Sequence, residues 1–144
     1  MKFDFNKIIR LRNIQIEKSK LSEEEKRLIA PILSEKNLIP VIYDHFIEIM
    51  KEKNPSERIG SVIQRKKFIF IIMFLFSPST LVGGKMSAGI RDEISKVTGC
   101  SKTLISHNCQ DIAFIYNVYS GFRKDVEYIY NEIINRLLSN GQIQ

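Results

Sequence analysis

The sequence has few cysteines, no tryptophan and no long apolar run. Its two cysteines, Cys100 and Cys109, are too few for a disulfide framework, so a reducing interior is expected. The longest apolar run, Phe68–Phe76, has nine residues, whereas a helix needs about 20 to span a bilayer. No apolar h-region follows the first residues, so we expect no secretory signal. These absences predict a chain in the cytoplasm of a bacterial cell, without membrane contact.

The second half of the chain has almost no net charge. Residues 1–67 carry 15 Lys and Arg against 10 Asp and Glu, a net +5, whereas residues 68–144 carry 7 against 6, a net +1. A surplus of this size permits contact with nucleic acid or an acidic partner without requiring it. The length of 144 residues and the 44% hydrophobic content are those of one globular domain, so a single domain over residues 1–144 is expected.

The side-chain sets of common enzymes are also missing from the sequence. It has no phosphate-binding glycine loop, no Ser-His-Asp set and no cluster of acidic metal ligands. Cys100, His107 and Cys109 lack the paired spacing of a zinc site, so no metal is expected. We therefore expect a protein that is not an enzyme and needs no cofactor.

Residues 1–20 are basic, and their apolar and polar residues alternate locally. Ile9 and Leu11 alternate with Arg10 and Arg12, a period of two that predicts a short strand or an extended arm. One strand alone is unstable. The arm is therefore expected to lie on its own core, to pair with another copy in a homodimer or higher homo-oligomer, or to follow a phosphate backbone.

From residue 21 onward the pattern is helical, and it predicts an all-α bundle of about six helices. Within residues 21–76, Ser22 and Glu25 form a capping box that should open a helix containing Pro31. A second helix is expected over residues 39–53. A third should start at Asn54-Pro55 and include the apolar run as the central helix of the fold.

Residues 77–87 are expected to form a hinge loop, because they contain Pro78 and the Gly83-Gly84 pair. Within residues 88–139 the pattern predicts helices over 88–98, 102–119 and 122–138. Gly99 and Gly121 are the expected stop residues between them.

The stretch ISKVTGCSKTLISHN, residues 94–108, has the spacing of two helices joined by a tight turn. Gly99 suits a left-handed turn position and Ser101 suits an N-cap, while Ile94, Cys100 and Ile105 are expected to be buried together. The stretch resembles the helix-turn-helix of bacterial DNA-binding regulators, whose typical form is apolar-Ala-x-x-Thr-Gly-apolar-Ser-x-x-x-Val-Ser. Ser95 stands where that form has alanine, and the matching residues are Ile94, Thr98, Gly99, Cys100, Ser101, Ile105 and Ser106.

The resemblance implies that the outward face of the second helix reads DNA. Residues of this face that could contact phosphates or base edges are Lys102, Thr103, Ser106, His107 and Gln110. Because the motif itself has few charges, further phosphate contacts are expected from Arg10, Arg12, Arg65, Lys66 and Lys67. The alternative for residues 65–67 is an exposed charged turn before the buried part of a helix.

Two functional hypotheses follow from the sequence. The first is a non-enzymatic DNA-binding protein that acts as a regulator or accessory factor. The second is a structural or assembly protein that uses its helices for contacts with protein partners. A basic arm and this motif in a short chain rich in lysine and isoleucine are similar to small proteins of tailed bacteriophages and mobile elements. Under the second hypothesis the protein would be a virion or packaging component.

Overall fold

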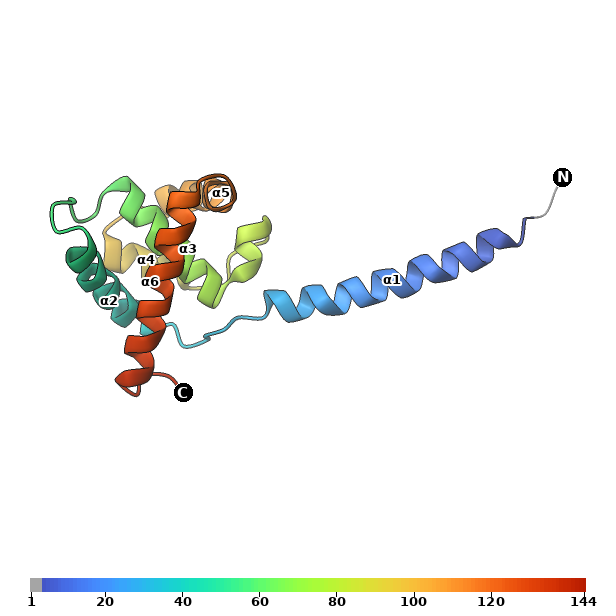
Figure 1. Cartoon of the computed structure of the whole chain (residues 1–144), viewed down its shortest axis with the longest axis horizontal. Coiled ribbons are helices and arrows are strands. Elements are labelled where there is room, and N and C mark those ends of the chain that lie inside the picture. The colour runs from blue at the N-terminus through green and yellow to red at the C-terminus, as the bar shows by residue number, and fades with distance from the viewer. Residues whose placement is uncertain (1–3) are drawn as a thin grey trace. The chain divides into compact units, whose positions relative to one another are not determined.

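The computed structural model describes residues 4–144, and over that range the chain is all-α, as predicted (Figure 1). The described residues contain six α-helices, one short 3-10 helix and no strand. Contacts divide the chain into two units, Met1–Ala30 and Pro31–Gln144. The elements in chain order are α1 (Asn6–Ile29), α2 (Leu38–Lys53), α3 (Val62–Phe76), η1 (Pro78–Val82), α4 (Ile90–Thr98), α5 (Lys102–Val118) and α6 (Ser120–Ser139).

The first unit consists of α1, and here the predicted extended arm is wrong. The chain is helical from Asn6 to Ile29, and none of its residues is buried. The first three residues of the predicted arm lie outside the described part of the chain. Ser22 lies inside α1 and does not open a helix, because the helix already runs through it. The helix ends before Pro31, since a proline disfavours the helical conformation of the residue before it.

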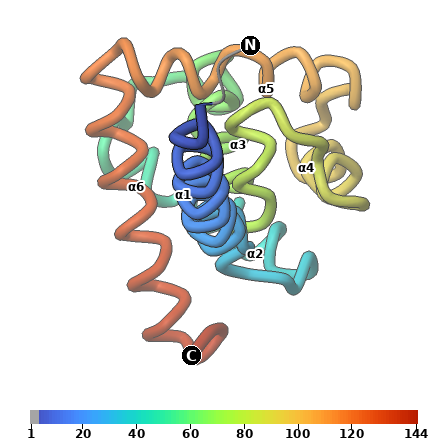
Figure 2. Tube along the Cα trace, turned by 90° about the vertical axis from the view of Figure 1, so that its right-hand side faces the viewer, coloured from blue at the N-terminus to red at the C-terminus, as the bar shows by residue number. Residues whose placement is uncertain are grey.

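Helix α3 is the centre of the second unit, as the apolar run predicted. Eight of its nine residues from Phe68 to Phe76 are buried, and Phe74 alone is 39% exposed. The helix contacts α2, α4, α5 and α6, and in Figure 2 it lies between α6 and α4. A helix that is apolar on all sides is stable only when other helices surround it.

Helix α3 begins later than predicted, at Val62 and not near Asn54. Gly60 has a left-handed φ of 80° and interrupts the chain before the helix. The Oγ of Ser61 accepts a hydrogen bond from the Gln64 backbone N–H at 3.3 Å, and the Gln64 side chain accepts one from the Gly60 N–H at 3.1 Å. This reciprocal capping satisfies one free donor of the first turn, the Gln64 N–H, and one donor just before the helix, the Gly60 N–H.

The predicted hinge loop contains a 3-10 helix with buried hydroxyl groups. Ser77 is 2% exposed, and its Oγ lies 2.8 Å from the Thr80 hydroxyl and accepts a hydrogen bond from the Ser87 N–H at 3.2 Å. A Cβ at Gly84 would lie 2.7 Å from the carbonyl oxygen of Ser79, so this close turn requires glycine. These contacts hold the connection between α3 and α4 in one defined turn.

The last three helices are close to their predicted bounds. Gly99 ends α4 with a left-handed φ of 72°, as expected. Gly121 is not the stop residue that was predicted between the last two helices. Helix α6 already begins at Ser120, and the glycine lies within its first turn.

Candidate nucleic-acid interface

Backbone and side-chain hydrogen bonds define the turn between α4 and α5. The Gly99 N–H donates to the Ser95 carbonyl oxygen at 2.9 Å, which closes α4. The hydroxyl of Ser95 donates to the Cys100 carbonyl oxygen at 2.7 Å. On the other side of the turn, the Oγ of Ser101 accepts from the Leu104 N–H at 3.2 Å, which caps α5. The turn is therefore fixed from both helices.

Apolar contacts hold the two helices together. Ile94 and Ile105 are fully buried, as predicted. Cys100 is only half-buried but packs against the same core. Its sulfur lies 3.8 Å from Nη1 of Arg65, on the side of the turn that faces α3. The two helices and their turn are thus part of the main core of the second unit.

The predicted reading residues lie together on the outer side of α5, with one exception in exposure. Lys102, Thr103, His107 and Gln110 are exposed. Ser106 is half-buried, and its hydroxyl donates to the Lys102 carbonyl oxygen at 3.1 Å within the helix. These five residues line one shallow hollow of about 230 Å³.

Two basic residues outside the predicted reading face, Arg91 and Lys85, lie at the same surface. Arg91 on α4 is exposed and lines the hollow together with the α5 residues. It also lines a neighbouring hollow of about 300 Å³, where Lys85 contributes a second positive charge. Among the described residues, no Asp or Glu lines either hollow. The surface around α5 is therefore more basic than the helix sequence alone indicates.

One acidic residue reduces this charge at the edge. The Nζ of Lys102 lies 2.7 Å from the carboxylate of Asp92, with both side chains about half exposed. The hydrogen bond from Lys102, followed by its charge, lowers the pKa of Asp92. Asp92 is therefore ionised at neutral pH and would compete with a phosphate for Lys102. An exposed pair of this kind is weak and can exchange partners.

Cys109 lines the second hollow but is poorly suited to chemistry there. Burial raises the pKa of its thiol to about 11. The reactive form of cysteine is the thiolate, and at neutral pH this thiol is protonated. Among the described residues, no group of three or more His, Cys, Asp and Glu side chains is arranged to hold a metal ion.

Lys66 and Lys67 do not form the predicted basic surface, and Arg65 is half-buried beside Cys100. Lys67 is 5% exposed, and its Nζ lies 2.9 Å from Asp125 on α6. The Nζ of Lys66 lies 2.9 Å from Asp111 on α5. These cations connect α3 to its neighbours, so we no longer expect them to contact a phosphate.

Arg10 and Arg12 are exposed on α1, in the other unit. Their charges are available to a partner, but on a helix and not on an extended arm. Within the described chain, no helix combines the length and the apolar character that crossing a membrane requires. Comparison of the sequence and the structure with protein-family models, with curated proteins and with solved structures found no match.

Proposed function

We propose that the protein binds double-stranded DNA through α4, its turn and α5, without enzymatic activity, as a regulator or accessory factor. The N-terminal part of α5 would enter the major groove, with Thr103, His107 and Gln110 facing base edges. Arg91, Lys85 and Lys102 would neutralise phosphates beside it. The observation that carries the proposal is the exposed polar face of a capped helix, flanked by basic residues and fixed by a short turn on a buried apolar anchor.

Binding of the full chain to a labelled DNA duplex, measured by fluorescence anisotropy over a range of salt concentrations, tests the proposal. The logarithm of the affinity should fall with the logarithm of the salt concentration, with a slope of about −0.9 for each neutralised phosphate. Arg91→Gln should weaken binding to all duplexes and reduce the steepness of that slope by about 1.

The matched control is Lys124→Gln, because Lys124 is an exposed cation on α6 that lines neither hollow. This variant removes the same charge from the chain and should leave the slope unchanged. Equal effects of the two variants would mean that only net charge matters. No binding at low salt would end the proposal.

A second candidate function, in an assembly with other proteins, is favoured by an apolar groove on the second unit. The groove has a volume of about 340 Å³ and is formed by η1, α3, α5 and α6. Phe74 and Val82 at this groove are 39% and 79% exposed, and exposed apolar side chains gathered at a groove are typical of an interaction site. Under this proposal the protein is a structural component, such as a virion or packaging protein, and the groove receives an apolar segment of a protein partner. Val82→Glu would then block incorporation into the assembly and leave DNA affinity unchanged.

A further inference from the structure

Helix α1 carries a row of large apolar side chains that remain exposed. Leu11, Ile14, Leu21 and Leu28 are 56%, 48%, 65% and 64% exposed. Within its first turn the helix has no acidic residue, and the Asp4 carboxylate before it accepts a single hydrogen bond, from the Asn6 N–H at 3.1 Å. Isolated helices are marginal in water and normally depend on burial of an apolar stripe. The stability of α1 therefore requires an apolar surface to cover this row.

The apolar row has the spacing of a coiled-coil seam. The steps from Leu11 to Ile14 and from Ile14 to Leu21 are three and seven residues, and Leu28 follows seven residues later. The intervening positions of the same alternating three-and-four repeat are Lys18 and Glu25, and the repeat begins at Lys7. A seam with this repeat is typical of a helix that packs lengthwise against another helix.

The charged residues in the seam determine the direction of the partner helix. In a parallel pair in register, Lys7, Lys18 and Glu25 would each face the same residue of the second copy. Like charges at facing seam positions are unfavourable. In an antiparallel pair with Leu11 level with Leu21 of the second copy, Lys7 instead faces Glu25, and Ile14 packs beside the aliphatic part of Lys18.

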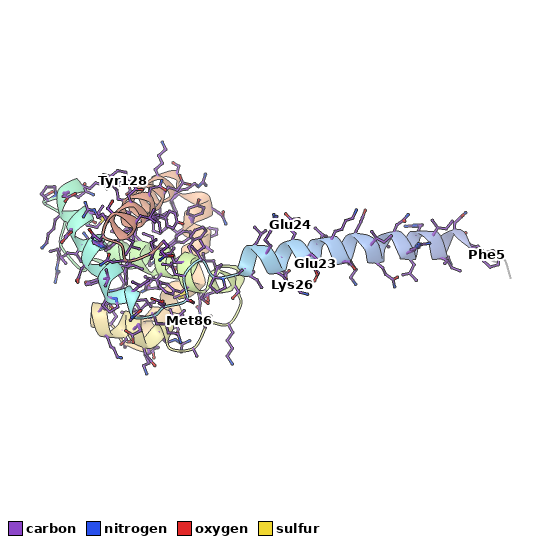
Figure 3. The ribbon with its side chains drawn as sticks, turned by 90° about the horizontal axis from the view of Figure 1, so that it is seen from below. Phe5, Glu23, Glu24, Lys26, Met86 and Tyr128 are labelled. Atoms are coloured by element: carbon purple, nitrogen blue, oxygen red, sulfur yellow. The ribbon has the colours of Figure 1, made fainter. Side chains whose placement is uncertain are left out.

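We propose that α1 pairs antiparallel with α1 of a second copy of this chain, in the register that sets Leu11 against Leu21 and Lys7 against Glu25. Residues beside the seam agree with this direction, because Arg10 then lies near Glu24 of the second copy. The labelled Glu23, Glu24 and Lys26 lie toward one end of the helix, while its first ten residues, 6–15, carry only basic charges (Figure 3). Among the charged residues, only Glu17 would lie near the same residue of the second copy. This like-charge contact is at the exposed flank of the two-fold axis.

The pairing is independent of the proposed DNA binding, and sedimentation of the full chain without DNA tests it. Lys7→Glu should place two acidic residues together in the seam and weaken the dimer about tenfold or more. The double variant Lys7→Glu with Glu25→Lys reverses both charges and should restore the dimer. A parallel pair would keep like charges facing each other in the double variant and would show no such rescue. A dimer that the double variant fails to restore would overturn the register.

Two apolar positions provide a matched control. Leu21→Asp should abolish the dimer, because it places a charge in the seam. Ile16→Asp makes the same chemical change at a residue that is 45% exposed outside the seam, and it should have little effect. Equal loss of the dimer in both variants would show that general apolar character, and not this seam, holds the copies together.

Disulfide cross-linking determines whether the two α1 helices are parallel or antiparallel. Lys7→Cys protein mixed with Glu25→Cys protein should form a disulfide between the two variants, whereas Lys7→Cys protein alone should not. Wild-type chain oxidised in parallel controls for Cys100 and Cys109, which are both half-buried. A disulfide between two copies of Lys7→Cys would show a parallel pair and overturn the proposal. A monomeric wild-type chain would also overturn the proposal. A dimer that is lost in the Val82→Glu variant would overturn it too, because that result would place α1 in the apolar groove of the other copy.

Discussion

At the scale of single residues, the turn between α4 and α5 depends on two residues that act in different ways. Gly99 provides a left-handed backbone conformation that side chains disfavour. Ser95 provides a hydroxyl that donates to the Cys100 carbonyl oxygen across the turn at 2.7 Å. The helix-turn-helix pattern that the stretch resembles has alanine at the position of Ser95, and alanine could not make this hydrogen bond. The one departure from the pattern therefore has a local structural reason.

Alanine substitutions at two glycines should have opposite effects on stability. At Gly99 a Cβ would meet no atom within 4 Å, but the φ of 72° is strained for alanine. Gly99→Ala should lower the free energy of unfolding by about 1–2 kcal/mol. At Gly121 a Cβ also meets no atom, and the residue lies inside α6. Gly121→Ala should raise the free energy of unfolding by about 0.5–1 kcal/mol. Urea unfolding of both variants measures these differences, and destabilisation by both would contradict the conformational explanation.

Single residues also show why part of the site could not be predicted from the sequence. The turn residues were identified because their spacing is local. Arg91 was not selected, since it lies on the preceding helix and only packing brings it beside Gln110. The sequence predicts that Lys67 contacts DNA, because the half-buried residue with which it pairs, Asp125, is 58 residues away in the sequence. Local patterns predict caps and turns, whereas the environment of a long charged side chain depends on distant residues.

At the scale of elements, the sequence pattern predicted the central position of α3 correctly and the structure of α1 incorrectly. Helix α3 is apolar on every side, and a central position was the only way to bury it. In α1 the alternation of Ile9, Arg10, Leu11 and Arg12 resembles a strand over four residues. The helical repeat is visible only over a longer window, through Leu11, Ile14, Leu21 and Leu28. A short window favoured the wrong period.

An ion-pair cluster joins three helices and makes their packing sensitive to acid. Asp125 on α6 accepts hydrogen bonds from Lys53 on α2 at 2.6 Å and from Lys67 on α3 at 2.9 Å. Burial raises the pKa of Asp125, but the two hydrogen bonds and the charges of the lysines outweigh it, so the pKa is lowered. A carboxylate with a lowered pKa in the folded state stabilises the fold above its unfolded pKa of about 3.9. That contribution is lost as the pH falls through the lower, folded value.

Asp125→Asn should therefore lower the free energy of unfolding by about 1–3 kcal/mol at neutral pH. The difference from wild type should shrink below about pH 4, where the wild-type carboxyl also becomes protonated. Denaturant unfolding at a series of pH values measures both effects. Asp44→Asn, at an exposed position on α2, is the control and should change little. A constant difference from neutral to acidic pH would mean that Asp125 acts through packing and not through its charge.

At the scale of the whole molecule, the two units differ in how they are stabilised. Every buried apolar residue of the described chain lies between Ile39 and Leu137, in the second unit. That unit begins with two backbone hydrogen bonds, from the N–H groups of Ile32 and Leu33 to the Leu75 carbonyl oxygen, both 2.9 Å. Helix α1 contributes no buried residue. The sequence predicted a separate arm only over residues 1–20, because the capping-box pattern at Ser22 and Glu25 indicated the start of a bundle helix there and not the middle of α1.

A chain of residues 31–144 should therefore fold without α1. It retains the whole buried core and the hydrogen bonds to Leu75, so its melting temperature should match that of the second unit in the full chain. It should also sediment as a monomer, because it lacks the seam through which we propose that α1 pairs. Full-length Leu21→Asp is the matched control: it keeps α1 but changes the seam, and it should be monomeric with the same melting temperature. A dimeric 31–144 chain would locate self-association in the second unit. Loss of cooperative unfolding in that chain would mean that α1 stabilises the core, contrary to its exposure.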